Sequence, residues 1–128
     1  LGFELVIVGP GDFCPADDYL AAVDAPNVSC VHDPVAASAG AHVLYTDVWV
    51  SMGMEDETAR REEIFTGYQV NAGLLAVADP NVIVMHCLPA YRGKEITDEV
   101  LEAHAATIFS EAENRLHAQK GILAWCFG

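Results

Sequence analysis

Residues 47–53 (DVWVSMG) bring together an acid, a hydroxyl and a glycine, which are residue types suited to binding a small charged substrate. The carboxylate of Asp47 can hold a substrate ammonium group, and Ser51 with the backbone amides around Met52 and Gly53 can receive a carboxylate. The segment therefore has the parts needed to bind the head group of an amino acid. A solvated acid followed by a turn glycine is an equally good interpretation.

A histidine and a cysteine are adjacent in a second segment, residues 86–90 (HCLPA), directly after the apolar run 82–85. The pair suggests a base and a nucleophile, but neighbouring side chains of an extended chain point to opposite sides, so a dyad of His86 and Cys87 is not expected. The alternative is a buried thiol beside a core histidine. The Leu88-Pro89 peptide bond is a candidate for a cis bond that shapes this loop.

Arg115 is the third residue with a potential role, in the segment ENRLH at the predicted start of the closing helix. A cation at a helix N-terminus is disfavoured by the helix dipole, so Arg115 should have an anionic partner. That partner is either a bound ligand or a nearby acid, Glu111 or Glu113.

Strands and helices alternate along the chain and must position these segments. Apolar, β-branched runs predict strands at 3–8, 28–32, 43–50, 82–85 and 107–109, and helical patterns occupy 15–22, 34–40, 58–78, 97–105 and 115–125. Thr97 is expected to cap its helix. The alternation predicts a single α/β domain with a doubly wound, mainly parallel, Rossmann-like sheet flanked by helices. Ligands of such folds bind beyond the carboxyl ends of the strands.

Composition and charge exclude several classes of partner. The 128 residues are 52% hydrophobic and 20% charged, as expected for one globular domain. A net charge of -13 makes nucleic acid and anionic membranes poor partners. No apolar block approaches the roughly 20 residues of a membrane span, which favours a cytoplasmic protein. The four cysteines form no CxxC pair, so reduced thiols are expected and no metal is expected.

Four segments together closely resemble ornithine carbamoyltransferases, in the same order and at similar intervals over nearly the whole chain. They are DVWVSMG at 47–53, YQVN at 68–71, HCLPAYRG at 86–93 and ENRLHAQK at 113–120. HCLP with an upstream SMG is the specific combination, because aspartate carbamoyltransferases differ at both places and putrescine carbamoyltransferases lack SMG. The resemblance implies transfer of the carbamoyl group of carbamoyl phosphate to the δ-amine of L-ornithine, giving citrulline and phosphate without a metal or cofactor. It also implies a place in arginine biosynthesis or the urea cycle, and a trimer for the full-length enzyme.

The resemblance assigns the ornithine side of the site to two segments. Asp47 would hold the substrate amine, and Ser51 with the backbone of Met52 would hold the α-amino-acid end. Cys87 would lie beside the attacking amine, and together with Asp47 it would help to present a neutral nucleophile.

The carbamoyl-phosphate side is assigned in the same way. The backbone of Cys87 and Leu88 and the side chain of Arg115 would contact carbamoyl phosphate, which supplies Arg115 with its anionic partner. His86 and Pro89 would shape the loop, and the cis Leu-Pro bond of the family would fall at Leu88-Pro89.

Some features of the family are missing from the sequence, namely its Ser-Thr-Arg-Thr phosphate loop, its His-Pro-x-Gln segment and a strand and helix upstream of LGFELVIV. Residues 1–128 are therefore expected to be a clipped ornithine-binding domain without the N-terminal carbamoyl-phosphate domain, weakly active or inactive alone. One alternative is an amino-acid-binding or self-associating α/β module, a monomer or a dimer formed through the apolar closing helix. Another is a hydrolase that uses Cys87 with a distant histidine as base: His32, His42, His104 or His117.

Overall fold

A computed structural model describes residues 2–22, 26–50, 53 and 55–128 of the chain. Its N-terminal part contains the strand β1 (Leu5–Val8), the short turn η1 (Gly11–Phe13), the helix α1 (Asp17–Ala22) and the strand β2 (Val28–Val31). β1 and β2 are parallel, with Leu5 opposite Val28 and Val8 opposite Val31. This order confirms the predicted strand, turn, helix and strand.

A second parallel pair follows. The helix α2 (Pro34–Ser38) leads into β3 (Val43–Thr46), which pairs with β4 (Ile83–His86) so that Val43 lies opposite Ile83 and Thr46 opposite His86. Within the described residues the strands form two sheets of two strands each, β1 with β2 and β3 with β4. The expected α/β fold with parallel strands flanked by helices is confirmed, and β3 is shorter than predicted.

The single amphipathic helix predicted for residues 58–78 is wrong. The segment after the turn η2 (Glu55–Glu57) is divided into α3 (Thr58–Phe65), η3 (Thr66–Tyr68) and α4 (Ala72–Val77). Val70 leaves the helical path to form a β-bridge with Ile96, and the Asn71 side chain accepts hydrogen bonds from the first amides of α4. A tertiary contact and a new N-cap therefore interrupt the helix, although the spacing of its apolar residues alone predicts a continuous one.

The C-terminal part also differs from expectation. The helix α5 (Asp98–Ala103) begins after Thr97, whose side chain accepts a hydrogen bond from the Val100 amide, as predicted. The strand predicted for 107–109 and the helix predicted for 115–125 are instead parts of one 23-residue helix, α6 (Ala105–Phe127). Ile108, read as a strand residue, is fully buried on the face of α6 that packs on the core.

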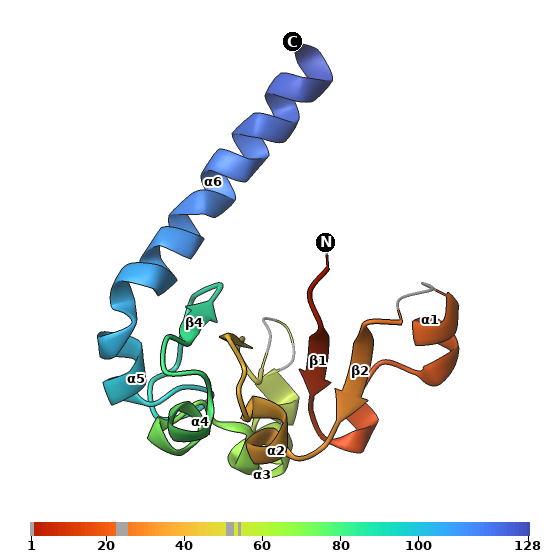
Figure 1. The fold of residues 1–128 in the computed structure, drawn as a ribbon, viewed down its shortest axis with the longest axis vertical. Coiled ribbons are helices and arrows are strands. Elements are labelled where there is room, and N and C mark those ends of the chain that lie inside the picture. Colours follow the sequence, from red (N-terminus) through yellow and green to blue (C-terminus); the bar gives the residue numbers. More distant parts are fainter. Residues whose placement is uncertain (1, 23–25, 51–52, 54) are drawn as a thin grey trace.

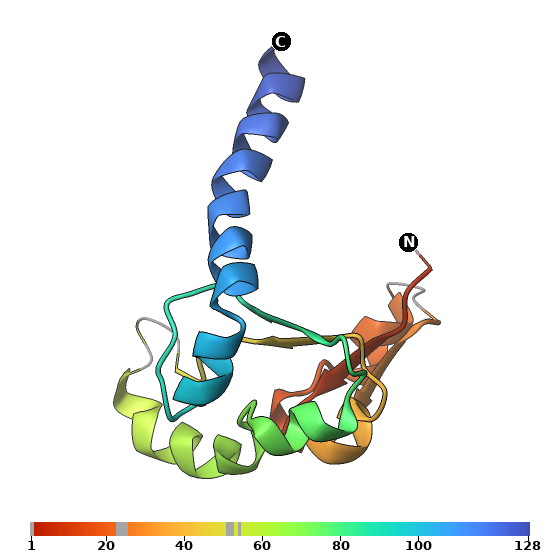
Figure 2. The ribbon, with the colours of Figure 1, turned by 60° about the vertical axis from the view of Figure 1, so that its left-hand side comes forward.

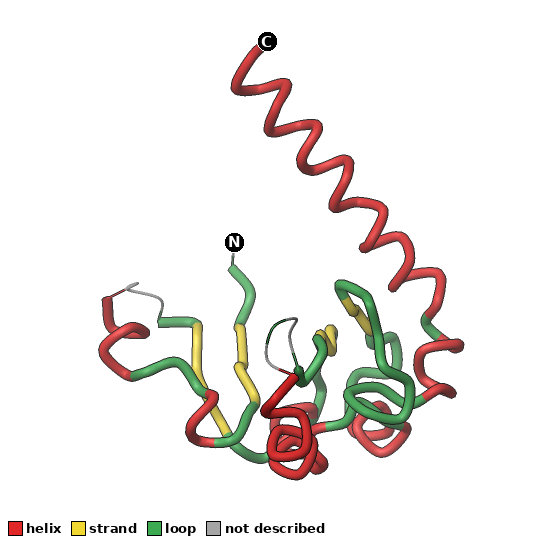
Figure 3. Tube along the Cα trace, turned by 180° about the vertical axis from the view of Figure 1, so that it is seen from behind, coloured by secondary structure: helices red, strands yellow, loops and turns green. Residues whose placement is uncertain are grey.

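The hydrophobic core is formed by residues of the second half of the chain. Its buried side chains belong to Val70, Val84, Ile96, Val100, Leu101 and Ile108. In Figure 1 the helices α2, α3 and α4 lie together on one side of the strands, and α6 runs away from the rest of the fold. Figures 2 and 3 show the same projection of α6 from other directions. All residues from 113 to 128 are exposed, so the core holds only the first turns of α6.

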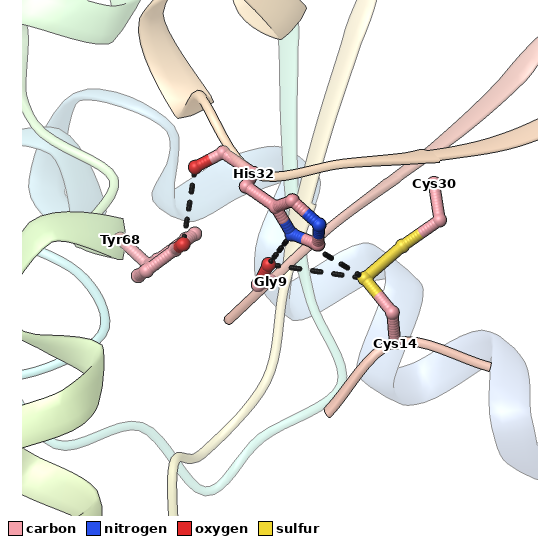
Figure 4. The surroundings of a disulfide bond; sticks show 5 residues. All are labelled: Gly9, Cys14, Cys30, His32 and Tyr68. Atoms are coloured by element: carbon pink, nitrogen blue, oxygen red, sulfur yellow. Dashed lines mark hydrogen bonds between the residues drawn. A yellow bond between two sulfur atoms is a disulfide. The ribbon is translucent and has the colours of Figure 1, made fainter. Parts of the chain in front are cut away.

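The expectation that all four cysteines are reduced is wrong, because Cys14 and Cys30 form a disulfide. The parallel pairing of β1 with β2 brings the turn after β1 back beside β2, which places the two Cα atoms 6.4 Å apart. Figure 4 shows that His32 lies next to the bond, with its Nδ1 2.8 Å from the Gly9 carbonyl oxygen. Cys87 and Cys126 are free thiols.

No helix of the described residues combines the length and apolar character required to cross a membrane.

Candidate active site

The carboxyl ends of β3 and β4 bring the two predicted loop segments together. Because Thr46 lies opposite His86 in the parallel ladder, Asp47 and Cys87 follow the two strands at the same edge. The Asp47 side chain is exposed, and its Oδ1 accepts a hydrogen bond from the Val48 amide at 2.7 Å. Asp47, His86 and Cys87 each have one atom that could ligate a metal ion, and these three atoms lie within 4.8 Å of one another. This is the edge at which parallel α/β sheets bind ligands.

The environment of Cys87 favours a neutral thiol. Burial raises the pKa of Cys87 above its ordinary value of 9.0, and the hydrogen bond with Asp47 and the charge of that carboxylate raise it further. A hydrogen bond with Tyr45 and the charge of Arg115 act in the opposite direction. The net shift is upward, so the thiol stays protonated at neutral pH.

A protonated thiol removes the premise of a cysteine-dependent hydrolase, which needs a thiolate. Three of the four distant histidines considered as bases have other neighbours among the described residues, and the fourth, His104, lies between two helices. His32 contacts the Gly9 carbonyl, His42 lies 4.0 Å from Asp79, and His117 lies 3.7 Å from Glu113.

His86 is fully buried and both of its ring nitrogens are engaged. Nδ1 accepts a hydrogen bond from the Leu88 amide at 2.9 Å, and Nε2 lies 3.2 Å from Oε1 of the buried Glu95. The same Glu95 oxygen accepts the Tyr91 amide at 2.5 Å. The imidazole is therefore not available as a base for Cys87, although the two side chains lie closer than an extended segment suggests. A metal ion at this cluster would have to displace one of the two ring contacts.

The loop after β4 has an unusual backbone. The Leu88-Pro89 peptide bond is cis, as predicted, and Leu88 has a φ of 54°. Few residues other than glycine adopt this left-handed conformation. The Leu88 amide is held by His86, and its side chain packs against the core. His86 thus sets the path of the chain from Cys87 to Pro89.

Arg115 reaches the same loop from α6. Its Nη1 donates a hydrogen bond to the carbonyl oxygen of Cys87 at 3.0 Å. The prediction that Arg115 lies at a helix N-terminus is wrong, because α6 begins ten residues earlier, at Ala105. The helix dipole therefore does not disfavour Arg115 at this position. The side chain of Arg115 is instead held by its hydrogen bond to the loop after β4.

The sequence did not predict that Tyr45 and Glu111 contact each other in this site. Glu111 accepts the His86 amide at 2.9 Å through Oε2, and its side chain is hydrogen-bonded to Tyr45. Partial burial and then this hydrogen bond raise the pKa of Tyr45, which remains a neutral donor. The alternation of side chains along a strand could have indicated Tyr45. Side chains two residues apart share a face, which places Tyr45 beside Asp47.

The predicted residues Ser51 and Met52 lie outside the described residues. The part of their loop that is described is anchored by aromatic packing. The Trp49 ring stacks on Phe65 with centroids 6.1 Å apart, and Phe65 meets Phe13 edge to face at 4.7 Å. Arg61 donates to the Trp49 carbonyl at 3.4 Å. The loop that begins at Asp47 is thereby tied to α3.

Comparison with known proteins identifies the family to which this chain is similar. Residues 1–126 match the family described as aspartate/ornithine carbamoyltransferase, Asp/Orn binding domain. An ornithine carbamoyltransferase of Synechococcus sp. is 51% identical over 133 aligned residues, which cover 100% of this chain and 44% of that protein.

Two solved structures have the same fold. The anabolic ornithine carbamoyltransferase of Campylobacter jejuni gives a TM-score of 0.87 at 36% identity, covering 97% of this chain and 43% of that one. The ornithine carbamoyltransferase of Pyrococcus furiosus gives a TM-score of 0.83 at 43% identity, covering 97% and 42%. The chain thus spans less than half the length of the relatives that it matches.

Proposed function

The chain belongs to the aspartate/ornithine carbamoyltransferase family, and we propose that residues 1–128 form the ornithine-binding domain of an ornithine carbamoyltransferase. The observation that carries the proposal is the meeting of Asp47, Cys87 and Arg115 at the carboxyl ends of β3 and β4. An acid for an amine, a neutral thiol and a guanidinium for an anion are the groups that a transfer from carbamoyl phosphate to ornithine requires.

The amine side of the reaction falls to Asp47 and Cys87. Asp47 is exposed and carries the carboxylate that accepts hydrogen bonds from the substrate amine, while Cys87 presents an uncharged sulfur beside it. An amine can attack a carbonyl carbon only in its neutral form. A carboxylate that receives the amine hydrogens, next to a thiol that stays protonated, orients this nucleophile without a second negative charge.

The phosphate side falls to Arg115 and the cis-proline loop. Attack of the δ-nitrogen on the carbonyl carbon forms a C–N bond, and collapse of the tetrahedral intermediate breaks the C–O bond to phosphate. Phosphate leaves with the bonding electron pair and takes up the one proton that the nitrogen loses. A guanidinium aimed at the Cys87 end of the loop stabilises the negative charge that develops on these oxygens.

The α-amino and α-carboxyl groups of ornithine are assigned to Ser51 and the Met52 backbone, on the loop that starts at Asp47. Gly53, which closes this loop, has a φ of 88°, a conformation that favours glycine. Trp49 packed on Phe65 fixes the start of the loop. We propose that Ser51 and Met52 hold one end of the amino acid while the other end reaches Cys87.

The remaining parts of the proposal concern the whole protein. With six Lys and Arg against nineteen Asp and Glu, this domain is poorly suited to hold a phosphate alone, so a second domain is proposed to supply most phosphate contacts. We expect a cytoplasmic homo-oligomer, a trimer for the full-length enzyme, that needs no metal or cofactor.

The decisive experiment measures citrulline formation from L-ornithine and carbamoyl phosphate. The chain is assayed alone and joined to the N-terminal portion of the Synechococcus relative, with aspartate and putrescine as competing acceptors. We expect activity only in the joined protein, a strong preference for ornithine, and its loss in Asp47→Ala. Asp18→Ala, which removes an exposed acid of α1, is the matched control. A joined protein that folds but forms no citrulline would refute the assignment.

A further inference from the structure

α6 contacts the end of β4 at two points that lie one helical turn apart. The first is the hydrogen bond from the His86 amide to Oε2 of Glu111, at 2.9 Å, and the second is the bond from Arg115 Nη1 to the Cys87 carbonyl, at 3.0 Å. Residues four apart on a helix lie on the same face. Glu111 and Arg115 therefore hold two consecutive residues of the loop from one side.

Glu111 also contacts the neighbouring strand. Its side chain is hydrogen-bonded to Tyr45, which lies two residues before Asp47 on β3. One carboxylate thus receives a backbone amide at the end of β4 and a phenol hydroxyl from β3, while its own backbone belongs to α6. Ionised acceptors make stronger hydrogen bonds than neutral ones.

The position of Arg115 depends on this arrangement because the arginine itself is poorly held. Its side chain is exposed, and from its third turn onward α6 projects into solvent, with all residues from 113 to 128 exposed. A guanidinium has five N–H donors, and its bond to the Cys87 carbonyl is made through Nη1. The backbone from which Arg115 extends is fixed one turn earlier by Glu111 and two turns earlier by the buried Ile108.

We propose that Glu111 is a positioning residue: it holds α6 against the carboxyl ends of β3 and β4 so that Arg115 presents its guanidinium to carbamoyl phosphate. The inference rests on the proposed function for the role of Arg115. Glu111 contacts neither substrate, and it acts only through the backbone of His86, the hydroxyl of Tyr45 and the helix that carries Arg115.

The kinetic test uses Glu111→Ala, Glu111→Asp and Glu111→Gln in the joined protein. Glu111→Ala removes the acceptor, and Glu111→Asp keeps the charge but shortens its reach, so both should lower kcat/KM for carbamoyl phosphate by about tenfold or more. Glu111→Gln keeps an oxygen for the His86 amide and should remain within about threefold of the parent. The KM for ornithine should change by less than about twofold in all three. Glu113→Ala, an exposed glutamate of the same helix, is the control and should match the parent.

A second readout does not depend on activity. The hydrogen-exchange rate of the His86 amide, measured by NMR on this chain, should rise about tenfold or more in Glu111→Ala and stay near the parent rate in Glu111→Gln. Unchanged exchange in Glu111→Ala would overturn the proposed contact. An equal loss for ornithine and carbamoyl phosphate, or no loss in a parent that forms citrulline, would overturn the positioning role. A parent that forms no citrulline would instead reject the function, and the exchange rates would still decide whether Glu111 holds the loop.

Discussion

The carbonyl oxygen of Cys87 accepts a hydrogen bond from Nη1 of Arg115 at 3.0 Å, across 28 residues of sequence. The contact joins the last helix of the chain to the loop that follows β4. It places a cation at the edge where Asp47 and Cys87 meet, and it makes the backbone of the cis-proline loop, rather than a neighbouring acid, the partner of Arg115 in this structure.

Arg115→Ala should lower kcat/KM for citrulline formation in the joined protein by about 10²–10³-fold, because a cation that meets developing negative charge is lost. Arg115→Lys should recover only part of the activity, since a lysine cannot reproduce the planar, forked set of donors. The thermal stability of both variants should stay near that of the parent, as the side chain is exposed. Lys120→Ala removes another exposed cation of α6 and serves as the control; an equal loss there would point to a general charge effect.

Cys87 should react slowly with iodoacetamide near pH 7, because its pKa lies above 9.0 and only the thiolate reacts. Raising the pH through this pKa deprotonates the thiol and should accelerate the reaction. Asp47→Asn removes a negative neighbour that raises the pKa, so the midpoint of the rate profile should move to lower pH. Mass spectrometry of the labelled peptides follows each site, with the exposed thiol of Cys126 as internal reference. A midpoint below pH 7 at Cys87 would contradict this environment.

Reduction of the Cys14–Cys30 disulfide should destabilise the N-terminal part of the chain. The bond closes a loop with a sequence separation of 16, and cross-links of about this length stabilise folded proteins by about 3 kcal/mol. We expect Cys14→Ser and Cys30→Ser to lower the melting temperature as much as a reducing agent does, with no further effect of reductant on either variant. Cys126→Ser should leave melting unchanged. Peptide mapping without reductant should recover the linked pair, and finding both cysteines alkylated would contradict the bond.

The isolated chain should self-associate through α6. Five large apolar side chains of this helix are between 56% and 86% exposed: Leu116, Ile122, Leu123, Trp125 and Phe127. Contiguous exposed apolar surface of this kind favours association in water. Sedimentation velocity at increasing concentration should detect a dimer or larger species, and Trp125→Glu with Phe127→Glu should shift the chain toward monomer. Tyr19→Glu, at another exposed aromatic residue, should not. A monomer at all concentrations would count against the interface.

The positions of β1 to β4 and of the site loops could be predicted from sequence because their signals are local, whereas the strand predicted for 107–109 is part of α6. The apolar runs at 43–50 and 82–85 predicted β3 and β4, which end at Thr46 and His86, and parallel pairing then brings Asp47 and Cys87 to one edge. The cap at Thr97 was predicted for an equally local reason, whereas the cis Leu88-Pro89 bond was predicted from the resemblance to the family. What the residues at these positions bind remains a prediction.

The features that could not be predicted depend on contacts between distant segments. The break between α3 and α4 follows from the bridge between Val70 and Ile96, which no helical pattern reveals. The partner of Glu111 is a backbone amide 25 residues away, and every residue has such an amide except proline. The disulfide depends on how the turn after β1 folds against β2, so cysteine spacing alone did not indicate it.

The concentration of the hydrophobic core in one part of the chain has a consequence for folding. The buried apolar side chains of the described residues lie between Val70 and Ile108, whereas β1 and β2 pair, among the described strands, only with each other. The chain should therefore open in stages, with β1, α1 and β2 as a separate cooperative unit of low stability that the disulfide restrains. Unfolding need not be two-state, and a protease should find the N-terminal unit well before it reaches the residues that surround Cys87.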